Sequence, residues 1–538
     1  MKNLYFASAA ALSLVACSPT ATVDPSPQPV VQTSADYAAT GLMAQSLPEL
    51  AIMLDTGEAT ATELTQAYLD RIDAIDRNGP RLQSVLALNP DAMAQAESSD
   101  ARRAAGETLG PLDGLPILLK DNIETLDPVA TTAGAFALQG NITGRDSPLV
   151  AGLRAQGAVI LGKTNLSQWA NFRSNDSVSG WSAVGGQVRN PHMLDRSPCG
   201  SSSGSGVAMA AGLAAGAVGT ETNGSIICPS NVNGIVGFKP TVGVVSQQYI
   251  VPISSTQDTA GPMTRTVRGA AMMLDAMATD GSSGYAASLD AGSLQGKRVG
   301  VLRFSQGSAD IQSRFNAGLA AMEAAGAELV EIEEFEREGE NYGRDSFGVL
   351  QWEFKATLDE YLADSPADIP VRSLEDVIAF NLADPREMAV FDQSIMDSSN
   401  DRSGLDDPDY LAAKANILRA TGERGIDAMM AEYNVDMLVS PSGPLSSRVD
   451  PVNGDTWPSW AGAGYLAAVA GYPHVTVPMG AVHSVPLGFS IMGSAGQDKA
   501  ILSYGYALEQ ATQARVEPTY LRDAYDVPEL KAALEPGR

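Results

Sequence analysis

Two groups of serine residues lie in one segment of unusual composition, 197–240. The first is the run 201–203, held between two glycines, and the second is the single residue Ser225. A serine hydroxyl becomes a nucleophile once another group takes its proton. The segment is rich in Gly, Ser and Ala, but Val, Ile and Met are interleaved throughout. Because flexible linkers lack such apolar residues, the pattern predicts a packed scaffold that holds these hydroxyls.

A lysine is available as the base. Histidine usually fills this role, but the chain has only three, His192, His474 and His483. Lys120 ends the apolar run PILLK, which predicts a buried strand. Burial lowers the pKa of a lysine because the charged form loses its hydration, and the neutral amine can accept a proton. Lys120 is therefore a candidate base.

Three blocks of the sequence resemble the signature of the amidase signature family of serine hydrolases. They are LPILLKDNIET (115–125), SPCGSSSGSGVAMAAG (197–212) and GTETNGSIICPS (219–230). Further blocks are similar to the bacterial peptide amidase branch, and these lie at 162–174, 179–191 and 252–263. The resemblance begins near residue 45 and continues to the C-terminal end. It implies one large α/β domain in which a mixed, twisted β-sheet is sandwiched between helices.

The resemblance also implies a role for three residues. In this family a lysine, a serine on a cis peptide bond and a nucleophilic serine act together. Carried over to this chain, Lys120 is the base, Ser201 is the relay and Ser225 is the nucleophile. The bond between Gly200 and Ser201 is then expected to be cis, which is rare for a residue other than proline.

A turn that ends at the nucleophile is expected to stabilise the oxyanion through its N–H groups. The resemblance places Thr222, Asn223 and Gly224 in this turn before Ser225, and gives Ser202 a supporting hydrogen bond. It implies an amidase that cleaves a carboxamide C–N bond through an acyl-enzyme. The expected substrates are C-terminal peptide amides or similar amides, with release of ammonia or an amine. No cofactor and no metal ion are implied.

Three residues depart from the family pattern. Asn223 replaces a glycine, and Asn is the next best residue where φ is positive. Ser203 also replaces a glycine, and Ile227 stands where many members carry arginine but peptide amidases carry an apolar residue. These changes leave the three reactive residues intact and bear on substrate choice. Three aromatic residues in matching blocks could line a substrate pocket or pack in the core: Trp169, Phe172 and Trp181.

Other patterns favour different functions. GSSSG (200–204) fits the GxSxG motif of an α/β-hydrolase esterase, with Ser202 as nucleophile and His474 or His483 as base, but no strand-like run precedes it. GAVILGKT (157–164) fits a phosphate-binding loop, but AVIL predicts the strand itself and leaves Lys163 a structural role. A non-catalytic binding lipoprotein of the same fold is another alternative. The resemblance to the glutaminase subunit of a tRNA-dependent amidotransferase is weaker.

Composition limits the partners. The chain has 538 residues, is 44% hydrophobic and carries a formal net charge of −28. Such a surface repels phosphate backbones, so no nucleic-acid partner is expected, and the chain is expected to be a monomer. Three cysteines and three histidines without CxxC or HExxH spacing argue against a zinc site. Cys199 and Cys228 are expected to be buried free thiols. A disulfide between them is the alternative, because the sequence gives no distance between the two residues.

The N-terminus predicts export. An apolar run, 4–16, follows Lys2 and has the length of a signal-peptide core. LVAC (14–17) resembles a bacterial lipobox, so 1–17 is expected to be a lipoprotein signal with a lipid anchor on Cys17. The following serine indicates sorting to the outer membrane, on its periplasmic side. The alternative is an ordinary cleaved signal and a soluble periplasmic protein. Residues 18–44 predict a disordered tether before the catalytic domain, 45–538.

Helices and apolar strands alternate along this domain, which predicts an α/β fold with a mostly buried sheet. The runs 85–88, 115–119 and 158–161 are expected strands. The small residues of 207–217 predict a tightly packed helix, with a short strand over 218–220. The polar segment 338–407 predicts a helical insertion beside the active site.

Overall fold

One mixed β-sheet of eleven strands runs through the protein. The structure is a computed structural model that describes residues 37–335, 341–458 and 460–534, and its strand order is β1-β3-β2-β6-β8-β7-β12-β13-β11-β9-β10. The strands are β1 (Val85–Leu88), β2 (Pro116–Lys120), β3 (Val159–Thr164), β6 (Gly216–Glu221), β7 (Val236–Lys239), β8 (Thr259–Thr264), β9 (Arg298–Leu302), β10 (Glu328–Ile332), β11 (Met437–Pro441), β12 (His474–Val482) and β13 (Val485–Met492). A separate ribbon pairs β4 (Trp181–Ser182) with β5 (Gly186–Gln187).

The three strands that matter most for the site are parallel neighbours. β2 pairs with β3 on one side and with β6 on the other. Their carboxyl ends therefore meet at one edge of the sheet, which is where open α/β sheets bind ligands. β2 and β3 are fully buried, and the predicted strands at 115–119 and 158–161 are confirmed with shifts of one to three residues at their ends.

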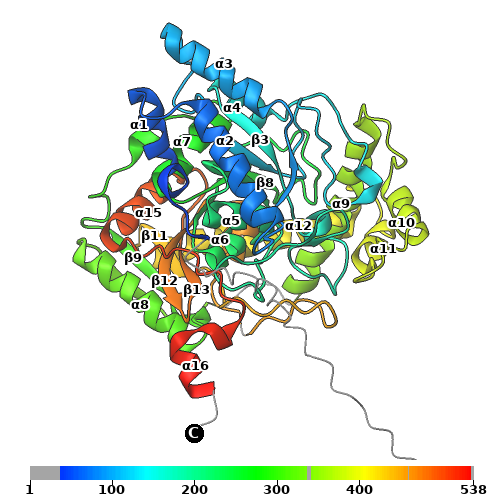
Figure 1. Cartoon of the computed structure of the whole chain (residues 1–538). Helices are drawn as coiled ribbons and strands as arrows, with labels where there is room; N and C mark the ends of the chain where they lie inside the picture. The colour runs from blue at the N-terminus through cyan, green and yellow to red at the C-terminus, as the bar shows by residue number, and fades with distance from the viewer. Residues whose placement is uncertain (1–36, 336–340, 459, 535–538) are drawn as a thin grey trace, which may run out of the picture.

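Helices cover both faces of the sheet (Figure 1). Gly216 of β6 faces Met273 of α7, and Gly219, three residues on, faces Ser202 at the start of α5, so the two helices lie on opposite faces. The helices are α1 (Leu47–Thr56), α2 (Ala61–Arg71), α3 (Ala92–Ala105), α4 (Pro148–Ala155), α5 (Ser203–Ala211), α6 (Ile227–Asn233), α7 (Val267–Met277), α8 (Ala309–Ala324), α9 (Tyr342–Asp364), α10 (Leu374–Ala383), α11 (Ser394–Asn400), α12 (Pro408–Thr421), α13 (Asp427–Glu432), α14 (Tyr465–Ala470), α15 (Asp498–Thr512) and α16 (Pro528–Leu534). The predicted single α/β domain with a mixed sheet between helices is confirmed.

The prediction of a helix over 207–217 is wrong at both ends. α5 begins at Ser203 and ends at Ala211, where Gly212 takes a left-handed conformation (φ +72°), and β6 starts at Gly216. Glycine ends helices in this way because it adopts positive φ without steric cost. Small residues satisfy a packed helix and a buried strand equally well, so composition alone could not place the boundary.

The polar segment 338–407 forms α9, α10 and α11, which gather at one side of the molecule (Figure 1). Residues 336–340 lie outside the described residues. These helices share an apolar cluster with the loop 133–138 and with Phe172. Leu350 of α9 lines a cavity that it shares with Ser225.

The N-terminal signal and most of the predicted tether lie outside the described residues. The described part of that tether, 37–44, packs against the domain, which corrects the prediction of a free tether there. Tyr37, Leu42 and Met43 pack on the main core, and the Arg71 side chain donates a hydrogen bond to the Tyr37 carbonyl. In the part of the chain that the structure describes, no helix is both long and apolar enough to cross a membrane.

Candidate active site

Lys120 lies at the carboxyl end of β2 and is completely buried. Its Nζ is 2.8 Å from Ser201 Oγ and 2.8 Å from Thr220 Oγ1, and it also donates to the Thr220 carbonyl. Among the described residues, no carboxylate oxygen lies within 4 Å of this Nζ. Burial lowers the pKa of Lys120 to about 7, against the opposing charges of Asp258 and Glu221. The amine is therefore held among hydroxyls, where its neutral form is readily reached.

Ser201 and Ser202 lie in the turn that leads into α5. The peptide bond between Gly200 and Ser201 is cis, as predicted. Ser202 Oγ donates to the Thr220 carbonyl and accepts from the Thr220 N–H, so it ties this turn to the end of β6. Its own N–H donates to the Ser225 carbonyl at 3.2 Å. Ser202 thus joins the segment of Ser201 to the segment of Ser225.

Ser225 follows β6 in the turn 222–225 and lines a cavity, whereas Ser201 and Lys120 are fully covered. Glu221 accepts hydrogen bonds from the N–H groups of Ile226 and Ile227, which fixes the far side of this turn. The N–H groups of residues 223–225 make no hydrogen bond with any described part of the protein. They remain available to a ligand atom in the cavity.

The expectation for Asn223 is wrong in one respect. It is Gly224, with φ +85°, that takes the left-handed conformation, and Asn223 is not among the residues with positive φ. The Asn223 side chain is exposed, and nothing lies within 4 Å of the position where Gly224 would carry a Cβ. A side chain at 223 therefore costs the turn nothing, because the adjacent glycine supplies the conformation.

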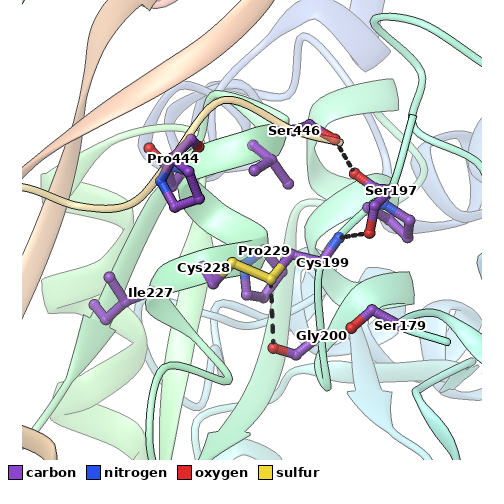
Figure 2. The surroundings of a disulfide bond; sticks show 12 residues. Ser179, Ser197, Cys199, Gly200, Ile227, Cys228, Pro229, Pro444 and Ser446 are labelled. Carbon is purple, nitrogen blue, oxygen red and sulfur yellow. Dashed lines mark hydrogen bonds between the residues drawn. A yellow bond between two sulfur atoms is a disulfide. The ribbon is translucent and has the colours of Figure 1, made fainter. Parts of the chain in front are cut away.

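Cys199 and Cys228 form a disulfide, which corrects the expectation of free thiols (Figure 2). Their Cα atoms are 5.9 Å apart although 29 positions separate them in the sequence. The Cys199 N–H donates to Ser197 Oγ, and Ser446 Oγ donates to the Ser197 carbonyl, so the segment before Gly200 is anchored on both sides (Figure 2). The bond links the segment of Ser201 directly to α6, which begins two residues after Ser225. Only the tertiary fold brings these cysteines together.

A cavity of about 240 Å³ opens in front of Ser225. Its polar side is formed by residues 222–225 and its wall includes both cysteines of the disulfide. The rest of the lining is mostly apolar and aromatic: Phe172, Ile253, Leu350, Trp457 and Trp460. Asp455 is the single ionisable side chain among the described lining residues. It accepts hydrogen bonds from the N–H and the hydroxyl of Ser179.

Of the three aromatic residues that the sequence offered for a pocket, only Phe172 lines this cavity. Trp169 is buried in the apolar cluster of the insertion, and Trp181 packs edge-on against Phe391. Trp457 and Trp460, which the sequence analysis did not single out, stand in their place and pack against each other. Ile227 is buried and is not part of the lining.

The residues of the esterase-type motif and of the phosphate-loop motif are not arranged for those functions. His474 bonds Ser490, His192 bonds the Asn233 carbonyl, and His483 is exposed near Glu529. None of the three makes a hydrogen bond with Ser201, Ser202 or Ser225 in the described structure. The segment 157–164 contains strand β3, and Lys163 Nζ binds the Ile123 carbonyl and Thr131 Oγ1. Within the described ranges, no group of three His, Cys, Asp or Glu side chains is placed to hold a metal ion.

Comparison with known proteins decides the family. The family model described as Amidase matches residues 63–502 of this chain. The chain belongs to the amidase family. It is 35% identical to a probable amidase of Arabidopsis thaliana over 88% of this chain and 91% of that protein. It is 33% identical to a glutamyl-tRNA(Gln) amidotransferase subunit of Halorhodospira halophila, over 87% of this chain and 97% of that protein.

The same conclusion follows from the fold. The crystal structure of native peptide amidase from Stenotrophomonas maltophilia superposes with a TM-score of 0.83, with 44% identity over 88% of this chain and 98% of that one. The predicted resemblance to amidase signature enzymes is thereby confirmed, and this amidase is a hydrolase that acts on the C–N bond of amides.

Two polar residues of the amidase site escaped the sequence analysis. Thr220 holds Lys120 through its hydroxyl, and Asp258 accepts a hydrogen bond from Thr222. Both lie within blocks that resemble the family, GTETNGS and STQDTAGPM, but neither residue type signals a role by itself. Their proximity to Lys120 and Thr222 depends on the pairing of β2, β6 and β8.

Proposed function

We propose that this amidase hydrolyses C-terminal peptide amides, or closely similar amides of a neutral acyl group, through Ser225, Ser201 and Lys120. The observation that carries the proposal is the 2.8 Å contact between the buried Lys120 Nζ and Ser201 Oγ, with no described carboxylate within 4 Å. A lysine in that setting can be neutral at pH 7 and can draw a proton from a hydroxyl.

The proposed reaction begins when the Ser201 proton passes to the neutral Lys120 and the Ser225 proton passes to Ser201. Ser225 Oγ then attacks the amide carbonyl carbon. The negative charge on the carbonyl oxygen is stabilised by the unpartnered N–H groups of 223–225. The C–N bond breaks as Lys120 returns its proton through Ser201 to the leaving nitrogen. A water molecule repeats the route on the acyl-enzyme and releases the acid.

The lining of the cavity supports a neutral, partly apolar acyl group. Aromatic and aliphatic side chains form one part of the wall, and no lysine or arginine is among the described lining residues. A substrate that carries a carboxylate next to the scissile amide would meet Asp455 without a compensating cation, which is unfavourable. A peptide with an amidated C-terminus avoids this charge. The 44% identity to a peptide amidase, against 33% to the amidotransferase protein, points the same way.

The test is ammonia release from a panel of amides with the full chain and two serine variants. Ser225→Ala is expected to lower kcat by at least about 10⁴-fold. Ser230→Ala is the matched control, because this buried serine lies on the adjacent helix α6 and bonds no reactive residue. Amidated peptides are expected to have the highest kcat/KM, and free glutamine the lowest.

Two results would contradict the proposal. Turnover that survives in Ser225→Ala would remove the assigned nucleophile. Loss of turnover in a His474→Ala, His483→Ala double variant, with Ser225→Ala active, would favour the esterase-type alternative that uses Ser202.

We also propose that the enzyme acts outside the cytoplasm, anchored through Cys17 to the periplasmic side of the outer membrane. The Cys199–Cys228 disulfide supports export, because such bonds persist in oxidising compartments. Fractionation of cells that express the full chain, with incorporation of labelled palmitate, tests this placement. Cys17→Ala should abolish labelling; a labelled Cys17→Ala protein or an unlabelled cytosolic wild type would contradict it.

A further inference from the structure

Asp258 is a buried carboxylate that holds two parts of the active site together. Its Oδ1 accepts a hydrogen bond of 2.5 Å from Thr222 Oγ1, at the start of the turn 222–225. Its Oδ2 accepts from the N–H groups of Ile253 and Ser254, at 2.8 and 2.9 Å. Ile253 lines the cavity in front of Ser225. One carboxylate thus fixes both the turn before the nucleophile and a loop of the substrate cavity.

A second carboxylate, Glu353 of α9, holds the same loop from the other end. It accepts hydrogen bonds from the Ser254 hydroxyl, from the Thr256 N–H and hydroxyl, and from Tyr410 Oη of α12 at 2.7 Å. The Glu353 side chain is completely buried, and Lys414 Nζ lies 4.0 Å away. A continuous chain of hydrogen bonds therefore runs from the turn of Ser225, through the loop 253–258, to the helical insertion.

Asp258 also faces the residues that hold Lys120. It lines a small cavity of about 20 Å³ together with Thr220 and Asn122, and both of these residues belong to the hydrogen-bond network of the lysine. No described lysine or arginine lies within 4 Å of the Asp258 carboxylate. The charges that act on Lys120 from the packed elements are those of Asp258 and Glu221, and both favour its protonated form.

Glu221 and Asp258 differ in the groups that donate hydrogen bonds to their carboxylate oxygens. One carboxylate oxygen of Glu221 accepts hydrogen bonds from the N–H groups of Ile226 and Ile227, which follow the nucleophile in the chain. Asp258 is bound to Thr222, which lines both cavities. Burial and the neighbouring Glu353 raise the pKa of Asp258 to about 6 against the lowering effect of its three donors, so it is ionised at pH 7 and above.

We propose that Asp258 is a positioning residue for amide hydrolysis, which fixes the oxyanion turn through Thr222 and adds a negative charge to the surroundings of Lys120, while Glu353 holds its loop. The inference rests on the function proposed above. It assigns the helical insertion a part in holding the catalytic turn, although the insertion supplies none of the three reactive residues.

The test compares Asp258→Asn with Glu353→Gln. Each variant changes a carboxylate that holds the loop 253–258 into an amide. The readout is the rate at which an alkyl fluorophosphonate modifies Ser225 between pH 5 and 9, in which Ser225 Oγ displaces fluoride from phosphorus. Asp258→Asn should lower the labelling rate about 10²-fold, as for loss of one oxyanion contact. It should also move the midpoint of the acid limb to lower pH by about one unit, because Lys120 loses a nearby opposite charge. Glu353→Gln should weaken substrate binding and leave that midpoint in place.

The outcomes separate this inference from the proposed function. An unchanged midpoint in Asp258→Asn, or the same shift in both variants, overturns the role of Asp258. Wild-type protein that is not modified at Ser225, or Lys120→Met modified at the wild-type rate, overturns the proposed function instead. If Asp258→Asn does not fold, Thr222→Val cuts the same hydrogen bond with the charge retained. It should lower the labelling rate without moving the midpoint, and an unchanged rate would overturn the positioning role.

Discussion

Two buried lysines lie on neighbouring strands and have opposite surroundings. Lys120 ends β2 and Lys163 lies near the end of β3, and both side chains are completely covered. Lys163 is the cross-strand partner of Leu119, one residue before Lys120. Because neighbours along a strand point to opposite faces, the two amines project to opposite sides of the sheet.

The difference lies in the partners that each face offers. Lys163 Nζ lies 3.8 Å from Asp121 Oδ1 and also binds a carbonyl and a hydroxyl. Lys120 Nζ meets the hydroxyls of Ser201 and Thr220 and the Thr220 carbonyl. Burial lowers the pKa of both lysines, and carboxylates oppose this effect at both: Asp121 at Lys163, and the more distant Asp258 and Glu221 at Lys120. The comparison indicates a structural cation on one face and a base on the other.

The largest expected effect is on turnover. Lys120→Met keeps the length of the side chain and removes the amine, and is expected to lower kcat on an amide by about 10⁴-fold or more, because the proton acceptor is lost. The free energy of unfolding, measured in urea, should fall only slightly, because no described carboxylate lies within 4 Å of the Lys120 amine to be left without its cation. Wild-type turnover in this variant would show that Lys120 is not the base, and would contradict the contrast between the two lysines.

The matched change on the other face should act on stability. Lys163→Met leaves the buried Asp121 carboxylate without its cation, which is expected to lower the free energy of unfolding by about 3–5 kcal/mol. Turnover per folded molecule should stay within a few-fold of wild type. A stable Lys163→Met protein that has lost turnover would place Lys163 in the reaction and contradict the contrast.

The disulfide lies next to Ser201, which contacts Lys120. Its removal should therefore affect the Lys120 site and leave the surroundings of Lys163 unchanged. A Cys199→Ser, Cys228→Ser double variant opens a loop of 29 positions and is expected to lower the free energy of unfolding by about 3 kcal/mol. Turnover should fall several-fold, since the segment of Ser201 is no longer tied to α6. Equal stability and turnover with and without dithiothreitol in the wild type would show that the bond has no such role.

The last prediction concerns the pH dependence of the unmodified enzyme. Burial lowers the pKa of Lys120 to about 7, and the neutral amine is the reactive form, so kcat/KM should rise through pH 7 and level off above it. Below this midpoint the rate should fall about tenfold per pH unit. The same midpoint is expected in Lys163→Met. An acid limb centred below pH 5 would show that another group is the base.

Local patterns predicted a large part of this arrangement. The run PILLK is a buried strand that ends at Lys120, and the bond before Ser201 is cis as the family resemblance implied. The strand depends on residues that are adjacent in the chain, so the sequence contains that information directly, whereas the cis bond was expected from the resemblance alone.

Other features could not be predicted in this way. The prediction of a helix over 207–217 is wrong because Ala and Gly fit either a helix or a strand, and the pairing of Cys199 with Cys228 depends on how α5 and α6 pack. The aromatic wall of Trp457 and Trp460 comes from a loop more than 200 positions away from Ser225. No local pattern connects that loop to the serines.

The amino-acid sequence alone indicates which groups could react: a lysine at the end of an apolar strand, and serines set among glycines. The role of each group depends on its neighbours in the folded protein. Lys120 meets Ser201 across 81 positions and Thr220 across 100, while Lys163 meets Asp121 on the opposite face. The physical reason is that the proton affinity of a buried amine depends on the charges and hydroxyls within a few ångströms, and only the folded sheet brings those neighbours into place.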